Sequence, residues 1–319
     1  SAFFDVRARD WSGEVLDLID GGSGQLRAAL PRLLKPEEIV GTLRPEVAAE
    51  LGLSPECIVS SGGGDNMMGA IGTGNVKEGV VTLGLGTSST VYSFCKHPVA
   101  DVTGSVASFC SSSGGWLPLV CTMNATNVVT QTWTLLGKTV SELDTALTAT
   151  QPGADGLTFL PFLNGERTPD LPRAKGSLVG ISSTNFTPEN LIRASVEGVS
   201  FGVLAGLDLI LGGKTPHVIF AIGGGARSKA WRQLLADATG ATIQVPAEEE
   251  AGCLGAAMQA IYAYRSVNGI STSFTEIADR CVRISADGVE TPHENRRAAY
   301  RVAMDVYKAA LDELYLKKN

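Results

Sequence analysis

The sequence lacks the clusters of cysteine and histidine that form metal and redox sites. Its 319 residues contain six scattered cysteines, none in a CxxC pair, and only three histidines. A zinc site or a disulfide framework is therefore not expected. We predict small buried core thiols in a reducing cytoplasm. These are Cys57, Cys95, Cys110, Cys121, Cys253 and Cys281.

Long apolar runs and blocks of like charge are also missing. No uninterrupted apolar stretch reaches the roughly 20 residues that a membrane span needs, and no signal peptide is visible. The formal net charge is −7, which gives no reason to expect a nucleic acid or an anionic membrane as partner. An acidic protein can still bind an anion such as ATP where backbone amides converge.

Several catalytic motifs are absent as well. There is no GxGxxG and no HExxH. Two GKT triplets, at 137–139 and 213–215, resemble a P-loop, but the first glycine of that motif is replaced by Thr132 and Asp208. These absences argue against a Rossmann dehydrogenase, a zinc protease and a P-loop NTPase. The three histidines, none of which stands next to a nucleophile in sequence, disfavour a Ser-His-Asp hydrolase.

What is present is an alternation of strand and helix patterns, which indicates an α/β fold. Strands are expected at 57–61, 80–94 (a hairpin), 105–110, 116–122, 157–163, 217–222 and 242–245. Helices are expected at 66–71, 124–137, 187–211, 227–240, 251–265 and from His293 onward. The helix at 187–211 has the clearest start, because Thr187 is a suitable N-cap and Pro188 suits the first position.

A triple glycine follows the strand at 57–61 and leads directly to Asp65. Glycine permits positive φ and close approach of a ligand, so this carboxylate is a candidate general base. Asp65 could equally be a helix N-cap, a position where aspartate is common. The same order of strand, triple glycine and helix recurs at 217–226, which could reflect two similarly built lobes or chance.

Two further glycine turns follow strands. The turn at 84–89 combines glycines with three hydroxyls and could direct them at a phosphate, or it could be an ordinary β-turn. The turn at 223–228 could hold a flat ring, or it could only pack a strand against a helix. Together, the three turns and one carboxylate indicate phosphoryl transfer, which relies mainly on positioning and charge.

Five ordered segments resemble the FGGY carbohydrate kinases over about residues 1–310. They are GGGDNMMGAIGTG (62–74), TLGLGTSS (82–89), GLTFLPFLNGERTP (156–169), GSLVGISSTNFTPENLIRASVEG (176–198) and AIGGGARSKAWRQLLADATG (221–240). The resemblance implies the actin/Hsp70/sugar-kinase fold, in which ribonuclease-H-like lobes each carry a mixed sheet flanked by helices. It divides the chain into the end of a sugar-binding lobe at 1–74 and a nucleotide-binding lobe at 75–319.

The resemblance also implies roles for individual residues. Asp65 matches the family's catalytic base and also contacts the sugar, and Asn66 matches a second sugar contact. Gly86 and Thr87 match a phosphate loop. The residues that match the adenosine motif are Gly224, Gly225, Ala226 and Lys229. The expected cofactors are ATP and Mg²⁺ bound with ATP, with no protein metal site. Gly252 and Gly255 match a glycine-rich helix at the lobe hinge, and Glu166 and Arg167 lie in a signature loop without a catalytic role.

Two family elements have no match in this chain. These are an acidic DxGT-type loop that binds phosphate and serves Mg²⁺, and a sugar-gripping Met-His segment. The sequence therefore resembles the end of the first lobe and all of the second, and we expect this chain alone to be inactive or nearly so. Equal rates from this chain and from one extended at its N-terminus would contradict that expectation.

The implied reaction is ATP-dependent phosphorylation of a ketopentose, and the GGGDN spelling favours D-xylulose. The alternatives are a kinase of ribulose, glycerol or gluconate, or a catalytically silent sugar- or nucleotide-binding module of the same fold. An ATP-driven chaperone or filament protein of the superfamily is disfavoured by the signature at 176–198. The family also leads us to expect a homodimer as one assembly.

Overall fold

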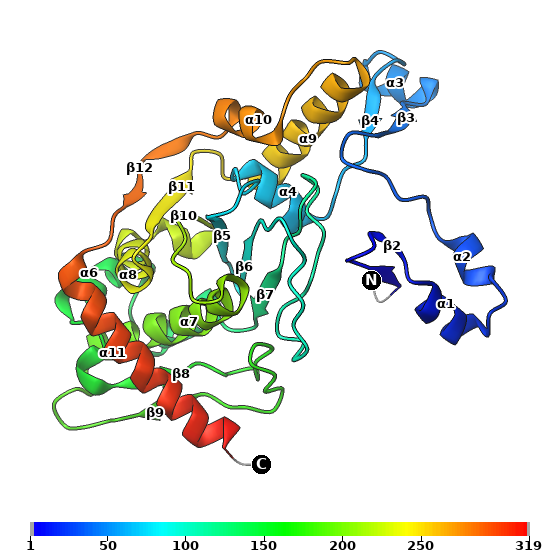
Figure 1. Cartoon of the computed structure of the whole chain (residues 1–319). Coiled ribbons are helices and arrows are strands. Elements are labelled where there is room, and N and C mark those ends of the chain that lie inside the picture. Colours follow the sequence, from blue (N-terminus) through cyan, green and yellow to red (C-terminus); the bar gives the residue numbers. More distant parts are fainter. Residues whose placement is uncertain (1–2, 318–319) are drawn as a thin grey trace.

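The centre of the molecule is a six-stranded mixed sheet, described by a computed structural model that covers residues 3–317 (Figure 1). The strand order is β12-β11-β10-β5-β6-β7. The bounds are Val80–Leu85 for β5, Ser89–Ser93 for β6, Leu119–Thr122 for β7, Val218–Ile222 for β10, Thr242–Pro246 for β11 and Ile284–Glu290 for β12. β5, β6 and β7 form an antiparallel meander, whereas β10 pairs parallel with both β5 and β11. The predicted mixed sheet and the hairpin at 80–94 are confirmed.

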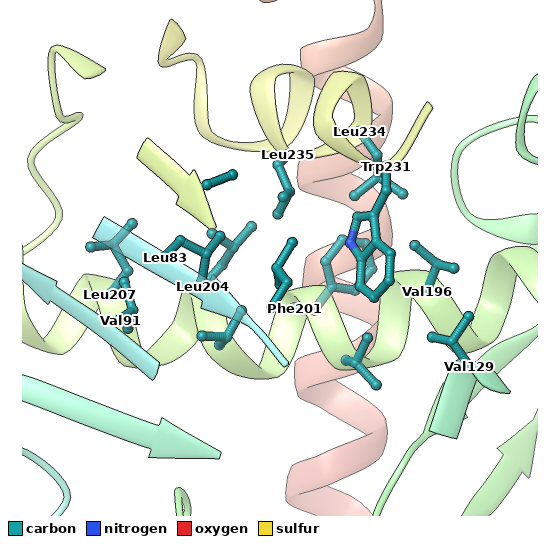
Figure 2. Close-up of a cluster of buried hydrophobic side chains, with 14 of the residues drawn as sticks. Leu83, Val91, Val129, Val196, Phe201, Leu204, Leu207, Trp231, Leu234 and Leu235 are labelled. Atoms are coloured by element: carbon teal, nitrogen blue, oxygen red, sulfur yellow. The ribbon is translucent and has the colours of Figure 1, made fainter. Parts of the chain in front are cut away.

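One face of this sheet is covered by five helices. They are α5 (Thr126–Leu135), α6 (Leu143–Ala149), α7 (Pro188–Leu211), α8 (Lys229–Thr239) and α11 (Glu294–Leu311). Figure 2 shows how α7 fills the space beneath the strands. Its residues Phe201, Leu204 and Leu207 lie among sheet residues such as Leu83 and Val91 and the α8 residues Trp231, Leu234 and Leu235. Burial of these side chains is the main favourable contribution to folding.

The start of α7 matches the sequence prediction. Thr187 is its N-cap and accepts a hydrogen bond from the backbone N–H of Asn190, and Pro188 occupies the first position. Within residues 3–317, α7 is also long and apolar enough to span a membrane, with a mean hydropathy of 1.6 over the critical stretch. However, 72% of that stretch is buried inside the protein, as in a core helix.

The opposite face carries α4 (Asp65–Gly72) and α10 (Phe274–Cys281), and α9 (Ala251–Val267) crosses α4. α4 and α9 touch through their backbones at two glycines. A Cβ on Gly72 would lie 1.8 Å from the carbonyl oxygen of Ala251, and one on Gly255 would lie 1.8 Å from that of Met68. The contact therefore requires glycine at both positions.

Residues 3–60 form small elements beside the sheet, coloured blue in Figure 1. Strands β1 (Phe4–Asp5) and β2 (Asp10–Trp11) pair with each other, as do β3 (Ile39–Thr42) and β4 (Ile58–Ser60). The helices are α1 (Gly13–Asp20), α2 (Gln25–Ala29) and α3 (Pro45–Leu51). The strand predicted at 57–61 corresponds to β4, which is not fully buried and pairs with β3 alone. The repeated strand–glycine–helix pattern thus does not produce a second mixed sheet within residues 3–317.

Two further strand predictions are corrected. Residues 105–110 make only isolated bridges, with Ala107 opposite Leu119 and Cys110 opposite Trp116. The strand expected at 157–163 is limited to β8 (Thr158–Leu160), which pairs with β9 (Ser177–Val179). Pro161 ends it, because proline has no N–H to donate to a ladder.

The expectation of buried thiols is wrong in detail. Five cysteines are half-buried and Cys253 is exposed, and all six are free. Cys253 lies in the first turn of α9, two residues from both Ala251 and Gly255, which face α4. A helix turns by about 100° per residue, so that spacing directs the Cys253 side chain to the other side.

Candidate functional site

Two of the three glycine turns meet at the end of the parallel pair β5 and β10, where Ile222 lies opposite Gly84. Gly223 has φ of 86°, and a Cβ there would lie 2.8 Å from the carbonyl oxygen of Leu85. A Cβ on Gly225 would lie 2.9 Å from Cβ of Leu85. Only glycine allows the two turns to approach this closely.

The turn at Gly86 and Thr87 presents hydroxyls, and the amide of Gly86 is used within the turn itself. The N–H of Gly86 donates within the turn to the carbonyl of Ser88, at 3.2 Å. Its carbonyl accepts from the N–H and the hydroxyl of Thr126, at 3.0 and 2.7 Å, which ties the turn to the start of α5. The side chains of Thr87 and Ser88 are exposed, and no hydrogen bond to either is formed within residues 3–317. Two hydroxyl donors are therefore free to bind a ligand.

Beside the turn at 223–228 lies a pocket of ≈ 700 Å³, large enough for a nucleotide. Gly224, Ala226 and Lys229 line it, on the short 3₁₀ helix 224–227 and the first residue of α8. Gly225 does not line the pocket, because it is buried beneath it against Leu85, Trp231 and Thr126. Gly86 and Thr87 lie on the neighbouring strand end and are not part of the lining.

The far wall of this pocket was missed by the sequence reading. It consists of residues 245–250, at the end of β11 and directly after it, and of Ser285, Asp287 and Gly288 on β12, a strand that was not predicted. Arg232 anchors that strand, because it is buried and its Nη2 bonds to Glu290 Oε1 at 2.8 Å. Arg227 and Glu249 form a more exposed ion pair at 3.2 Å among the lining residues.

Asp65 is the first residue of α4 and is not its cap. The N-cap is Gly64, and no side chain caps this helix. Oδ1 of Asp65 accepts from the backbone N–H of Asn66 at 2.7 Å and from Asn66 Nδ2 at 3.2 Å. The residue is exposed, and no hydrogen bond to Oδ2 is formed within residues 3–317. This carboxylate oxygen can therefore accept a proton, or a hydrogen bond from a hydroxyl group, of a ligand.

The glycines before Asp65 allow a backbone turn and a close contact that other residues would not. Gly62 has φ of 65°, in the left-handed region. A Cβ on Gly63 would lie 2.3 Å from Oγ of Ser112 and 2.7 Å from Cε of Met68. The triple glycine thus lets the chain turn and pass close to the 111–114 loop before α4 begins.

The packing of α4 fixes Asp65 against β6 and β7. Met67 and Ala70 of α4 contact a cluster that includes Tyr92 and Cys121. Burial, together with the nearby charge of Asp65, raises the pKa of Tyr92, so its phenol stays neutral. At the other end of α4, the Thr73 hydroxyl lies 2.7 Å from that of Thr82, which also accepts from Asn75 Nδ2.

The loop after β8 is held beside the same strands by Glu166. This buried carboxylate accepts from the N–H of Met123 at 2.6 Å, from Asn124 Nδ2 at 2.9 Å and from the N–H of Arg167 at 2.7 Å. Its role is to position the loop. The sequence signal for this role is weak, since nothing links residue 166 to residue 123 along the chain.

Within residues 3–317, no group of three or more histidine, cysteine, aspartate or glutamate side chains could hold a metal ion.

Comparison with known protein families gives two matches. The pattern of the C-terminal domain of the FGGY family of carbohydrate kinases matches residues 81–264, and that of the N-terminal domain of the same family matches residues 1–72.

Curated relatives and a solved structure agree with these matches. The chain is 41% identical to the xylulose kinase of Haemophilus influenzae over 99% of this chain and 63% of that kinase. It is 43% identical to the xylulose kinase of Streptomyces rubiginosus, over 73% of this chain and 46% of that kinase. The crystal structure of xylulose kinase from Bifidobacterium adolescentis superimposes with a TM-score of 0.77 and 32% identity, covering 94% of this chain and 60% of that one. The chain thus spans less than two thirds of each of these proteins.

Proposed function

Because the chain belongs to the FGGY family of carbohydrate kinases, we propose that the protein phosphorylates D-xylulose with ATP to give D-xylulose 5-phosphate. The observation that carries the proposal is the placement of Asp65. An exposed carboxylate with one oxygen free stands at the start of α4, which packs on β7 and on β6, one of the two strands that the Gly86 turn joins.

In the proposed reaction, Asp65 acts as general base. Its carboxylate accepts the proton of the sugar hydroxyl while that oxygen attacks the γ-phosphorus of ATP and ADP leaves. Asn66, whose amide is already oriented by Asp65, contacts the sugar. Substrate-positioning of this kind reduces the entropic part of the barrier.

The nucleotide is proposed to bind across the two glycine turns. Gly86 and Thr87 would contact the phosphates, and Gly224, Ala226 and Lys229 would contact the adenosine in the pocket. Gly225 would not contact the nucleotide. Because it has no side chain, it would let the turn at 223–228 pack closely against Leu85. When bound, Mg²⁺ would neutralise phosphate charge, and the nucleotide would bring it to the site.

The proposal divides the chain into the end of a sugar-binding lobe at 1–74 and a nucleotide-binding lobe at 75–319. The two domain matches, at 1–72 and 81–264, support a boundary in the short segment between them. We also propose a cytoplasmic protein that acts on small molecules, without a nucleic-acid or membrane partner. A homodimer is proposed as its assembly by family analogy alone.

A sugar panel tests the activity. The chain is assayed as it stands and as a chimera in which it replaces the aligned part of the Haemophilus influenzae kinase. ADP formation is followed with D-xylulose, D-ribulose, glycerol and gluconate. We expect D-xylulose to give the highest kcat/KM in the chimera. A higher kcat/KM with another substrate would favour a kinase of that sugar or polyol. Nucleotide binding without sugar-dependent ADP formation would favour a silent binding module.

A further inference from the structure

Arg167 carries a charge that the structure leaves without a partner. Its side chain is exposed, and within residues 3–317 its guanidinium forms no hydrogen bond or ion pair. By contrast, Arg193 and Arg232 form buried pairs with Glu197 and Glu290. An unpaired guanidinium is free to bind an anion, and its planar fork matches phosphate oxygens.

The backbone of Arg167 is connected to the candidate phosphate turn by a short series of hydrogen bonds. Glu166 holds the N–H of Arg167 and, with the same carboxylate, the N–H of Met123 and the amide of Asn124. Three residues after Met123, the N–H and hydroxyl of Thr126 bind the carbonyl of Gly86. The loop that presents Arg167 is therefore fixed relative to the turn of Gly86 and Thr87.

Arg167 and Asp65 also act on the same sulfur atom. Burial raises the pKa of the Cys121 thiol, the charge of Arg167 opposes that rise, and the charge of Asp65 adds to it. Met67, two residues after Asp65, packs in the cluster that Cys121 joins. The guanidinium and the candidate base thus both lie close to the end of β7.

We propose that Arg167 binds the phosphoryl group while it passes from the nucleotide to the sugar hydroxyl. The inference rests on the proposed function and adds to it a second charged contact. In the step, the bond from the γ-phosphorus to the bridging oxygen of ATP breaks, and a bond to the sugar oxygen forms. The sugar proton passes to Asp65, and ADP leaves with the electron pair. Arg167 neutralises charge on the transferred oxygens and exchanges no proton.

Equilibrium binding to the full chain tests this role without requiring turnover. Isothermal titration calorimetry compares ATP with ADP, each with Mg²⁺ and without sugar, for the wild type, Arg167→Gln, Arg167→Lys and Arg173→Gln. Arg173 is the matched control, since it is exposed in the same loop and has no side-chain partner within residues 3–317. Circular dichroism and thermal melting confirm that each variant is folded.

We expect Arg167→Gln to weaken ATP binding by about tenfold while the ADP affinity stays within about twofold. Arg167→Lys should weaken ATP binding less, because lysine keeps the positive charge but lacks the planar guanidinium. Arg173→Gln should match the wild type. If Arg167→Gln behaves like Arg173→Gln, or weakens ATP and ADP equally, the role of Arg167 is refuted while the kinase proposal stands. The same titrations are made with the chimera described above. If neither the wild-type chain nor the chimera binds either nucleotide, the proposed function fails and this inference fails with it.

Discussion

At the residue scale, the proposed phosphoryl transfer depends on where two opposite charges lie. Asp65 keeps one carboxylate oxygen free at the start of α4, and the guanidinium of Arg167 is free in the loop that Glu166 anchors. Each charge lies on a segment that is held in place by residues distant from it in sequence, α4 by β6 and β7 and the Glu166 loop by Met123 and Asn124. Cys121 on β7 is sensitive to both, which makes its thiol a probe built into the site.

Alkylation of Cys121 should report these charges directly. Burial raises the pKa of this thiol, so little reactive thiolate is present near neutral pH. Removing the Arg167 charge with Arg167→Gln should raise the pKa further and slow the reaction. Removing the Asp65 charge with Asp65→Asn should lower the pKa and speed it. The measurement is peptide-resolved mass spectrometry of iodoacetamide labelling in the folded protein between about pH 7 and 9.

Cys95 is the internal control for that experiment. Burial and the charge of Glu78 raise its pKa, and neither Asp65 nor Arg167 contributes to the shift. Its labelling rate should be the same in all three proteins. Equal labelling rates of Cys121 in the wild type, Arg167→Gln and Asp65→Asn would show that neither charge affects this thiol.

At the element scale, the crossing of α4 and α9 positions the base. Gly72 and Gly255 allow the two backbones to touch, so that α4, with Asp65 at its start, is held against α9 as well as against the sheet. The glycine-rich character of 251–255 was visible in the sequence. The partner of that glycine face was not, because α4 and α9 are about 180 residues apart.

Gly255→Ala should therefore destabilise the protein, whereas Gly252→Ala should not. A Cβ at 255 would meet the backbone of Met68 at 1.8 Å, which side-chain rearrangement cannot relieve. We expect a loss of about 1–3 kcal/mol or more in urea unfolding. Gly252 lies in the same helix with no atom within 4 Å of its Cβ position, so alanine there should be neutral or slightly stabilising. Similar unfolding midpoints for both variants would contradict the close crossing.

The sequence was most informative where structure depends on near neighbours. The cap and first turn of α7 follow from Thr187 and Pro188, and the β5–β6 hairpin follows from two strand patterns joined by a tight glycine turn. The sequence was least informative where contacts are distant. The approach of Gly63 to Ser112, the anchor from Glu166 to Met123 and the strand β12 all depend on packing that no local pattern encodes. The glycines at 62–64 illustrate this limit, since their number reflects a turn and a close contact as much as access to Asp65.

At the scale of the whole molecule, one mixed sheet carries both parts of the candidate site. The pocket proposed to bind the nucleotide opens at the end of β10 and β11, and Asp65 and Arg167 lie by β6 and β7 on the other side of β5. The core beneath the sheet, with α7 at its centre, makes these parts a single rigid support (Figure 2). Nucleotide binding should therefore stabilise the whole fold and not only the pocket.

ATP with Mg²⁺ should raise the melting temperature of the wild type. A ligand at about 100 times its Kd adds roughly 2.7 kcal/mol to the stability of the folded state. Gly224→Leu should abolish this shift, because its side chain would project from the pocket lining, where a Cβ meets no atom within 4 Å. Gly13→Leu is the control, since it also has open space and lies on α1 away from the pocket. A thermal shift that survives in Gly224→Leu would place the nucleotide elsewhere.

The central claim is that Asp65 is the base of a phosphoryl-transfer site, and turnover by Asp65→Asn tests it most directly. In the chimera with the Haemophilus influenzae kinase, kcat for D-xylulose should fall by roughly 10²–10⁴-fold. ADP affinity, measured by calorimetry, should stay within about twofold of the parent chimera. Wild-type kcat in the variant would contradict the account and return Asp65 to a structural role at the start of α4.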